Sequence, residues 1–494
     1  MRKHRLGDKL IVIFLFVALV LPVVTMNRVK GKISETENRV LASFPEIFDQ
    51  QGNFIPDAVS GIQNWFNDNL GFRSELVSLN SLFQFNILNC SPSEKVEIGK
   101  DGWFFYTQDN NIDMAKGTYP NFQEADLQKI CVQQTRIQQK LKEKGIEYVL
   151  ILPPSKVSIY PEYIRSGDYT IRKTPDDILA DYLEAHTTIK VIRLKDELIK
   201  QKDIGQLYLK TDTHWNELGS YVGYNKIIND LNKWGIINDE PAEVEFEDGY
   251  YKGEFSAMMG NINLLEPESC PKSKIVSPDA VKIEDGERYN EINEQMQTYY
   301  PNSVFYLYQN SDVEGPKVLM YGDSMFGSWN ITELLAENFS EFTFIWDYEI
   351  KDDILESIKP DIIFYDMGER YLNQLHAKSS SFIQIPLNAP DAEISSAKVD
   401  GATVEVSVTN MGTESWHGID QIRLGLWKNN VDTGYRIEIP SGVTVAPGES
   451  IVFTSEDFPF NIADGAYYEF QMLQEGIQYF GEKERVDITA VSGN

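Results

Sequence analysis

Short, unbroken apolar runs, most of them directly after a helical segment, are the feature that most limits how this chain can fold. EYVLILP at 147–153 and KVIRL at 190–194 each follow a helical pattern. KVLMYG at 317–322 and IIFYDMG at 362–368 are similar runs, and the second again follows a helical segment. Strands that are apolar on both faces are typical of a parallel sheet covered by helices on both sides. We therefore predict one α/β domain over residues 90–386, with functional side chains at the carboxyl ends of its strands.

The last hundred residues have a different pattern. Residues 390–494 hold short alternating segments joined by Gly, Pro and Asn turns, which predicts an immunoglobulin-like β-sandwich. Four aromatic side chains there could present flat faces to sugar rings: Trp416, Trp427, Tyr468 and Tyr479. Because tryptophan in a small sandwich more often packs in the core, a core position for Trp416 is the alternative. A carbohydrate-binding role for this domain stays open.

The N-terminus carries an apolar run over residues 10–26 behind a basic flank. A run of this length is near the lower limit for crossing a bilayer, and basic flanks stay in the cytoplasm. We predict a cytoplasmic tail over 1–9, an uncleaved single-pass transmembrane anchor over 10–26 and a helical linker region over 27–89. A cleaved signal peptide is the alternative. In either case the rest of the chain is expected outside the cytoplasmic membrane.

The formal net charge of −30 restricts the partners of the chain. Nucleic acid phosphates repel a polyanion, so no nucleic acid partner is expected. The same charge slightly favours a neutral polysaccharide, such as a cellulose-like glucan, over an anionic one. The three cysteines allow at most one internal disulfide, and their spacing matches no metal motif.

A serine stands where a buried strand gives way to a helical pattern. In KVLMYGDSMFGSWNITELL, the tripeptide Gly322-Asp323-Ser324 ends the apolar run. A hydroxyl at a helix N-terminus would meet backbone N–H groups and the helix dipole, which can stabilise a developing oxyanion. The alternative is an ordinary helix cap, since Ser and Asp are favoured there without any catalysis. The next glycine, Gly327, comes one residue too late for the G-x-S-x-G elbow of the α/β-hydrolases.

A second polar segment, TDTHWN at 211–216, precedes a strong helical pattern. If the segment is extended, Asp212 and His214 point to the same side, because strand side chains alternate. The carboxylate could then orient the imidazole as a general base. A histidine satisfied by local hydrogen bonds is one alternative, and a metal site built from Asp212, His214 and Asp323 is a weaker one. We predict that no metal is bound.

Together, the two motifs resemble those of a known family. Asp212-x-His214-Trp215, followed much later by Gly322-Asp323-Ser324, is similar to the SGNH-hydrolase-like polysaccharide O-acetyltransferases typified by the alginate acetylation proteins AlgJ and AlgX, including their DHHW-type relatives. Further fragments support the resemblance in the same order: ENRVLASFPE at 37–46, WFNDNLGFR at 65–73, IGKDGWFFY at 98–106, LPPSKVSIYPEY at 152–163 and DIIFYDMGERYL at 361–372. The resemblance covers roughly residues 35–375.

The resemblance implies a catalytic triad with Ser324 as nucleophile, His214 as base and Asp212 as the residue that orients it. It implies that acetyl groups pass through a Ser324 acyl-enzyme onto hydroxyls of an exopolysaccharide or cell-wall glycan. It also implies an MBOAT-type multipass acyltransferase as acetyl supplier, no bound cofactor, and a catalytic domain held at the outer face of the cell membrane. A polysaccharide acetyl esterase with the same triad and a non-catalytic polysaccharide-binding subunit of a synthase complex are the alternatives.

The sequence departs from the usual SGNH pattern because it lacks a clear block carrying the oxyanion Gly and Asn. The amide of Ser324 or Met325 could supply one donor. Further candidates for the oxyanion site or for substrate contact are Trp215, Lys156, Arg370 and Tyr371. For Arg370 and Tyr371 the alternative is a solvated loop after a strand, and for Lys156 it is a surface position.

Overall fold

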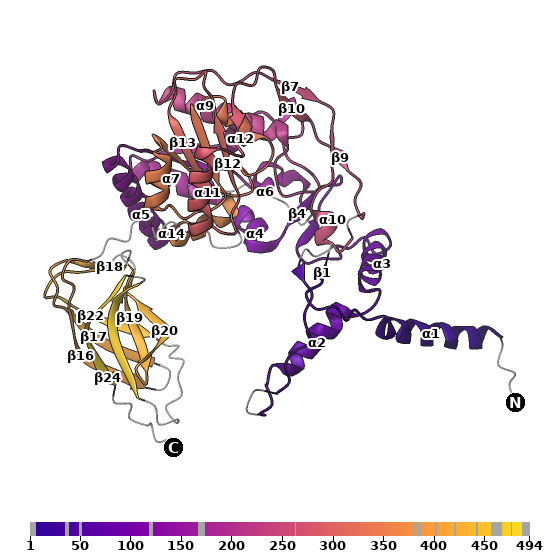
Figure 1. Ribbon diagram of the computed structural model, residues 1–494, viewed down its shortest axis with the longest axis horizontal. Coiled ribbons are helices and arrows are strands. Elements are labelled where there is room, and N and C mark those ends of the chain that lie inside the picture. The colour runs from indigo at the N-terminus through magenta and orange to yellow at the C-terminus, as the bar shows by residue number, and fades with distance from the viewer. Residues whose placement is uncertain are drawn as a thin grey trace.

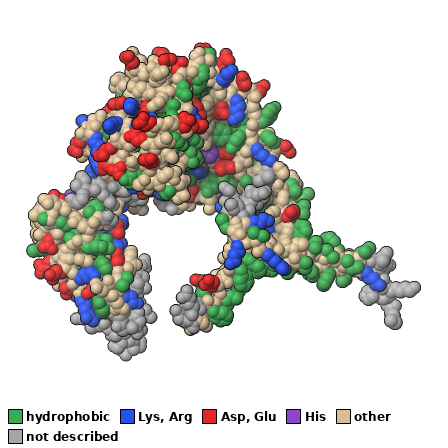
Figure 2. Space-filling view, in the orientation of Figure 1, with side chains coloured by type: hydrophobic (Ala, Val, Ile, Leu, Met, Phe, Trp, Pro, Cys, Tyr) green, Lys and Arg blue, Asp and Glu red, His purple; other side chains and the backbone are tan. Residues whose placement is uncertain are grey.

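The computed structural model describes residues 6–34, 39–48, 52–117, 122–165, 173–261, 263–378, 382, 387–400, 403–418, 421–440, 443–455, 467–475 and 477–486. Figure 1 shows an α/β part built around a central sheet, a C-terminal part made of strands, and the helices of the N-terminal segment. Acidic side chains are spread over the α/β part on the face drawn in Figure 2, in keeping with the net charge of −30.

A seven-stranded sheet runs through the α/β part in the order β11-β12-β14-β13-β15-β5-β6. Its strands are β5 (Glu147–Leu152), β6 (Lys190–Arg193), β11 (Val281–Lys282), β12 (Phe305–Gln309), β13 (Lys317–Tyr321), β14 (Glu341–Ile345) and β15 (Ile362–Asp366). The five strands from β14 to β6 are parallel. β12 pairs antiparallel with β14, and β11 pairs antiparallel with β12. The predicted α/β sheet is confirmed, but the antiparallel edge that β11 and β12 form was not predicted.

Helices cover both faces of the sheet, and each face has its own apolar core. In β5, Val149 and Ile151 pack into the first core, whereas Tyr148 and Leu150 pack into the second. The helices of the first core include α6 (Lys156–Ile159), α8 (Lys195–Lys200), α9 (Glu217–Lys233) and α12 (Ile331–Ala336), and those of the second include α5 (Glu124–Glu143), α7 (Pro175–His186), α11 (Glu287–Tyr299) and α13 (Asp352–Ile358). Burial on both faces explains why these strands are unbroken apolar runs.

Helices α9 and α7 each begin with a side-chain cap. The Asn216 side chain caps α9 by accepting from the Gly219 amide at 3.0 Å. In α7, Thr174 and Asp177 form a capping box and Pro175 occupies the first helical position. Such caps satisfy amides that have no partner inside the helix, so the chain direction is fixed where α9 follows the TDTHWN segment.

Small elements build a wall beside the carboxyl edge of the sheet. They are the hairpin β3 (Val96–Ile98) and β4 (Phe104–Tyr106), the pair β8 (Tyr250–Tyr251) and β9 (Glu268–Ser269), and the short helix α10 (Phe255–Met258). The Phe104 amide donates to the Lys210 carbonyl at 3.0 Å, and the Phe255 amide donates to the Thr211 carbonyl at 3.1 Å. The β3–β4 hairpin and helix α10 are therefore attached to the loop that carries Asp212 and His214.

The C-terminal part consists of two main sheets packed around one apolar core, which confirms the predicted β-rich fold. One sheet contains β16 (Ala392–Asp400), β17 (Thr403–Asn410) and β22 (Ser450–Ser455), and the other contains β19 (Ile422–Lys428), β20 (Val431–Glu438), β23 (Tyr468–Gln474) and β24 (Gln478–Val486). Trp416 and Tyr468 are fully buried in this core. The interpretation of Trp416 as a sugar-binding residue is therefore wrong, because its ring cannot reach a ligand.

The other two sugar-binding candidates lie together at the surface of this part. Trp427 and the exposed Tyr479 form an edge-to-face pair with ring centroids 5.2 Å apart. The Lys483 ammonium lies 3.4 Å from the centroid of the Trp427 ring, and the Tyr479 hydroxyl donates to Asp432 at 2.7 Å. The lysine thus takes one face of the indole that a sugar would need.

The N-terminal segment contains the helices α1 (Leu6–Val24), α2 (Ala58–Asn69) and α3 (Arg73–Asn86). Among the residues that the structure describes, no helix has both the length and the apolar character needed to cross a membrane. The predicted transmembrane anchor over 10–26 is therefore not supported.

Candidate active site

Ser324 lies in a tight turn that follows β13 at the carboxyl edge of the sheet. The Asp323 side chain accepts from the Met325 amide at 2.8 Å, and the Asp323 carbonyl accepts from the Gly327 amide at 2.8 Å. Helix α12 begins only at Ile331. The expectation that Ser324 stands at a helix N-terminus, whether as a catalytic residue or as an ordinary cap, is therefore wrong.

Two residues explain why the helix begins late. Trp329 and Asn330 have φ angles of +69° and +60°, which a right-handed helix does not allow. The Trp329 carbonyl is held by the Ser220 hydroxyl at 2.7 Å, and the Asn330 side chain donates to the Ser273 hydroxyl at 2.8 Å. The chain therefore leaves the Ser324 turn as a fixed loop rather than as a helix.

Asp323 anchors this turn to the neighbouring strands. Its Oδ2 accepts from the Tyr348 hydroxyl at 2.9 Å and from the Gly368 amide at 3.0 Å. Its own amide donates to Asp366 at 3.0 Å. Both carboxylate oxygens of Asp323 thus accept hydrogen bonds, and among the described residues Glu254, not Asp323, joins Asp212 and His214 in a cluster of ligand-type atoms. The metal site considered from Asp212, His214 and Asp323 is therefore not formed.

Asp212 and His214 lie in a loop closed by a bridge between Tyr208 and Trp215. The Leu209 amide donates to the His214 carbonyl at 3.1 Å, and residues 211–214 form a turn followed by a bend. The expectation that this segment is extended is therefore wrong. The two side chains still meet, because the bend brings the Asp212 carboxylate back onto the His214 amide at 3.2 Å.

The side chains of Asp212, His214 and Ser324 form a continuous chain of hydrogen bonds. His214 Nδ1 lies 2.6 Å from Asp212 Oδ1, and His214 Nε2 lies 2.8 Å from Ser324 Oγ. These distances are within the range of ordinary hydrogen bonds. The sequence-predicted triad residues are therefore brought together although 110 residues separate His214 from Ser324.

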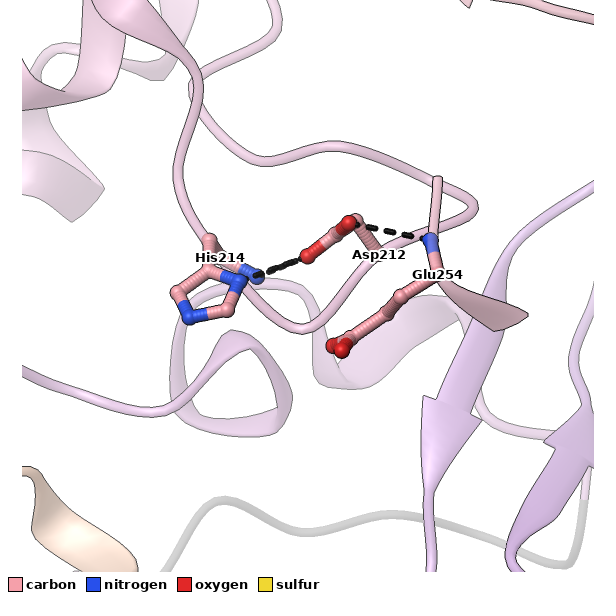
Figure 3. A group of neighbouring side chains, drawn as sticks. All are labelled: Asp212, His214 and Glu254. Carbon is pink, nitrogen blue, oxygen red and sulfur yellow. Dashed lines mark hydrogen bonds and ion pairs between the residues drawn. The ribbon is translucent and has the colours of Figure 1, made fainter. Parts of the chain in front are cut away.

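The Asp212 carboxylate is buried and fully bonded. Its second oxygen accepts from the Glu254 amide at 3.0 Å (Figure 3). Burial alone would raise the pKa of this carboxyl, but the His214 ring and the two amides outweigh it, so the pKa is lowered from its usual value. Asp212 is therefore an anion that can hold the proton of His214 on Nδ1, and this leaves Nε2 to face Ser324.

Glu254 is a neighbour of this pair that the sequence did not indicate. Asp212, His214 and Glu254, which Figure 3 draws together, place ligand-type atoms within 4.8 Å of one another. The Glu254 carboxylate accepts from the Thr213 hydroxyl at 2.5 Å and from the Thr213 amide at 3.2 Å. Because the oxygens of Asp212 already accept N–H donors, this group reads as a hydrogen-bonded clamp on the loop.

A cavity opens beside Ser324 and His214, and most of the other predicted residues line it. They are Lys156, Met325, Arg370 and Tyr371, joined by Tyr106 and Asn111, which were not predicted. The Arg370 guanidinium lies 5.1 Å from the Tyr106 ring centroid and 4.7 Å from that of Tyr371. Arg370 and Tyr371 therefore belong to the wall of the site and not to a free surface loop.

The two amides proposed for an oxyanion differ in their availability. The Met325 N–H is taken by Asp323 at 2.8 Å, so Met325 is a poor donor to substrate. The Ser324 amide makes no hydrogen bond to any residue that the structure describes. Ser324 is thus the better of the two candidates.

Trp215 and Lys156 occupy other environments than predicted. Trp215 is fully buried, and its ring packs edge to face on Phe326 with ring centroids 5.6 Å apart. It therefore packs beneath the Ser324 turn and does not touch substrate. Lys156 is only 4% exposed, so the surface position is wrong. Its ammonium points at backbone carbonyls of the loop that carries Asp212.

Asp366, at the end of β15, is a further residue of the site region that the sequence analysis missed. An acid directly after a buried strand, in FYDMG, was the available signal, because such positions face the site edge of an α/β sheet. Burial and the negative charge of Asp323 raise its pKa well above the usual value, and its Oδ1 has no hydrogen-bond partner among the residues that the structure describes. Asp366 is therefore held as a neutral acid under the Ser324 turn.

We expect Asp366→Asn to gain stability relative to wild type as the pH rises. The raised pKa means that the unfolded chain loses the Asp366 proton above about pH 4, while the folded chain keeps it. This difference destabilises the wild type progressively towards neutral pH, and asparagine cannot titrate. Urea unfolding at pH 4.5, 6 and 8 measures it, with the exposed Asp285→Asn as control. A difference between variant and wild type that does not change with pH would contradict the neutral acid.

The α/β part of the chain is similar to a known family. Residues 96–297 match the family described as SGNH hydrolase-like domain, acetyltransferase AlgX, and this match includes Asp212 and His214 but ends before Ser324. The resemblance inferred from the sequence motifs is thereby confirmed.

Individual proteins are also similar to this chain. A probable alginate O-acetylase AlgJ of Pseudomonas aeruginosa is 23% identical over 296 residues, which are 56% of this chain and 70% of that protein. The corresponding protein of Pseudomonas syringae pv. tomato is 28% identical over 173 residues, covering 33% of this chain and 41% of that one. Among solved structures, the O-acetyltransferase domain of Pseudomonas putida AlgJ is 18% identical, covers 58% of this chain and 96% of its own, and gives a TM-score of 0.40.

Proposed function

We propose that this protein is an O-acetyltransferase that moves acetyl groups onto hydroxyls of a polysaccharide through an acyl-enzyme on Ser324. The observation that carries the proposal is the hydrogen-bonded chain from Asp212 through His214 to Ser324, which ends at a cavity. A serine becomes nucleophilic when an adjacent base takes its proton, and a carboxylate behind the base fixes the tautomer that can do so.

The first half of the reaction acylates the enzyme. His214 Nε2 accepts the proton of the Ser324 hydroxyl while Oγ attacks the acetyl carbonyl of the donor. Asp212 stabilises the imidazolium that forms, and the Ser324 amide, which has no acceptor among the described residues, donates to the developing oxyanion. Collapse of the intermediate returns the proton from His214 to the leaving group and leaves acetyl-Ser324.

The second half transfers the acetyl group. A sugar hydroxyl enters the cavity, gives its proton to His214 Nε2 and attacks the acetyl carbonyl of the acyl-enzyme. The bond between the acetyl carbon and Ser324 Oγ then breaks, and Oγ takes the proton back from His214. Arg370 and Tyr371 line the same cavity and are placed to contact the acceptor. We further propose that the reaction takes place outside the cytoplasm, that an MBOAT-type multipass acyltransferase supplies the acetyl group, and that the acceptor is a neutral glucan.

A polysaccharide acetyl esterase is the second candidate, because the same geometry would serve water as acceptor. Whether sugar or water reaches the acyl-enzyme separates the two functions. The experiment is acetyl release from a chromogenic acetyl ester, with and without cello-oligosaccharides, followed by mass spectrometry of the sugar. We expect each acetylated oligosaccharide to be about 42 Da heavier, because one acetyl group replaces one hydrogen. We also expect added oligosaccharide to raise the rate of acetyl release several-fold. Ester hydrolysis that oligosaccharides do not alter, with no acetylated sugar, would assign an esterase instead.

A further inference from the structure

The loop 209–214, which carries Asp212 and His214, is held by ionic groups on both sides of its backbone. On the carbonyl side, the Lys156 ammonium donates to the carbonyls of Leu209 at 3.0 Å, Lys210 at 3.1 Å and Asp212 at 2.5 Å. These three hydrogen bonds use every donor that a lysine ammonium has. The ammonium is therefore committed to the loop and is not available to a substrate.

On the amide side, two carboxylates accept hydrogen bonds from the loop backbone. Glu268 accepts from the amides of Lys210 and Thr211, each at 2.7 Å. Glu254 accepts from the Thr213 amide at 3.2 Å. The loop has little ladder pairing of its own beyond the bridge between Tyr208 and Trp215, so these side chains set its path.

The surroundings of Lys156 are unusual for a surface-type residue. It is 4% exposed, and its ammonium lies 4.7 Å from the Phe255 ring centroid, 5.3 Å from that of Phe105 and 5.8 Å from that of Trp103. Among the described residues, no carboxylate lies within salt-bridge distance of Nζ. Aromatic faces and carbonyl oxygens are thus the groups in direct contact with the buried ammonium.

From this geometry we propose that Lys156 is a positioning residue: its ammonium holds loop 209–214 so that His214 lies in register with Ser324. The inference rests on the proposed function, because the register matters only if His214 serves Ser324. A shift of about 1 Å in a catalytic group can cost about 100-fold in rate, so a modest relaxation of the loop is enough for a measurable effect. Lys156 acts through the loop and touches neither reacting atom.

The protonation of Lys156 gives the proposal a second readout. Burial lowers its pKa to about 7, against the negative charges of Asp212, Glu268 and Glu254, which raise it and which are the titratable groups that face it. A neutral amine has one N–H fewer, so one of the three carbonyls loses its donor. We therefore expect kcat to decline on the alkaline side of neutrality, and Lys156→Arg, which stays charged, to move that decline up by more than one pH unit.

The test uses the full chain with three variants. Lys156→Met keeps the length of the side chain and removes the ammonium, whereas Lys156→Arg keeps a cation and its donors. Lys210→Met is the matched control, because it removes a lysine of the same loop whose ammonium makes one exposed hydrogen bond to the Asp101 carbonyl. Each variant is measured for melting temperature, kcat, KM, and the downfield proton resonance of the hydrogen bond between His214 Nδ1 and Asp212.

We expect Lys156→Met to lower kcat by about 10- to 100-fold with KM changed less than about twofold, and to shift or broaden the downfield resonance. Lys210→Met should leave both unchanged, and Lys156→Arg should recover part of kcat. A wild-type kcat and an unmoved resonance in Lys156→Met would overturn the proposal, and a change confined to KM would assign Lys156 to substrate contact instead.

Two further outcomes separate the proposals from each other and from misfolding. If wild type and Ser324→Ala release acetyl at the same rate, the proposed function fails, yet the resonance still tests whether Lys156 orders the loop. If Lys156→Met does not fold, the wild-type profile decides: a decline of kcat above about pH 7 supports the role of the ammonium, and a constant kcat up to pH 9.5 overturns it.

Discussion

Ser324→Ala is expected to lower kcat for acetyl release from a chromogenic ester by about 10⁴-fold or more, because removing the nucleophile of a serine triad removes the covalent route entirely. The loss should appear equally with and without oligosaccharide, since both acceptors need acetyl-Ser324. Stability should change by less than about 0.5 kcal/mol, because the hydroxyl is partly exposed and its hydrogen bond to a described residue is the one with His214.

The matched control for this variant is Ser328→Ala, which removes an exposed hydroxyl four residues further along the same loop. Initial rates of acetyl release and thermal unfolding are measured for wild type, Ser324→Ala and Ser328→Ala. Equal rates for wild type and Ser324→Ala would remove Ser324 from the mechanism, and with it the proposed acyl-enzyme. Equal losses in both variants would point to a disturbed loop and not to a missing nucleophile.

The centre of the sheet could be predicted because its strands are buried on both faces. β5, β13 and β15 consist almost wholly of buried residues, and such runs have few alternatives to a covered parallel strand. β12 is different, since three of its five residues are partly or fully exposed, and it is antiparallel. An edge strand of this kind leaves a weaker pattern in the sequence, which is why the antiparallel edge was missed.

The meeting of His214 with Ser324 could be expected from the motifs, but its geometry could not. Two strands, β15 and β5, lie between β13 and β6 in the sheet, so the loop after β6 must reach back across them. The reach depends on Lys156, Glu254 and Glu268, which approach the loop from other parts of the chain. A local reading of TDTHWN predicted an extended segment because none of these distant partners is visible in six residues.

Lys156 shows the same limit for a single residue. In the sequence it follows a strand within a polar turn, where a lysine is normally solvated. Its burial depends on carbonyl groups that lie 53 to 56 residues later and on aromatic rings of β4 and α10. The spacing of apolar residues in the sequence does not indicate contacts between such distant residues, so only the structure shows the burial of Lys156.

Asp212→Asn is expected to lower kcat by about 10³- to 10⁴-fold while His214 and Ser324 stay in place. An asparagine can turn its NH₂ towards Nδ1, which places the imidazole proton on Nε2, and a protonated Nε2 cannot accept from Ser324. It also removes the negative charge that stabilises the imidazolium formed in each half-reaction. The control is Glu254→Gln, which neutralises the neighbouring carboxylate but leaves its amide donating to Asp212, and it should cost less than about tenfold.

The pH dependence of stability distinguishes a lost charge from a disturbed loop. The folded-state pKa of Asp212 is lowered, so its carboxylate contributes stability that is present above the unfolded value of about 4 and disappears as the pH falls through the folded value. Wild type should therefore be more stable than Asp212→Asn at pH 7, and the difference should shrink in acid. A difference that stays constant from pH 7 to pH 3 would mean that the substitution disrupts packing, and the loss of kcat could then no longer be assigned to the tautomer of His214.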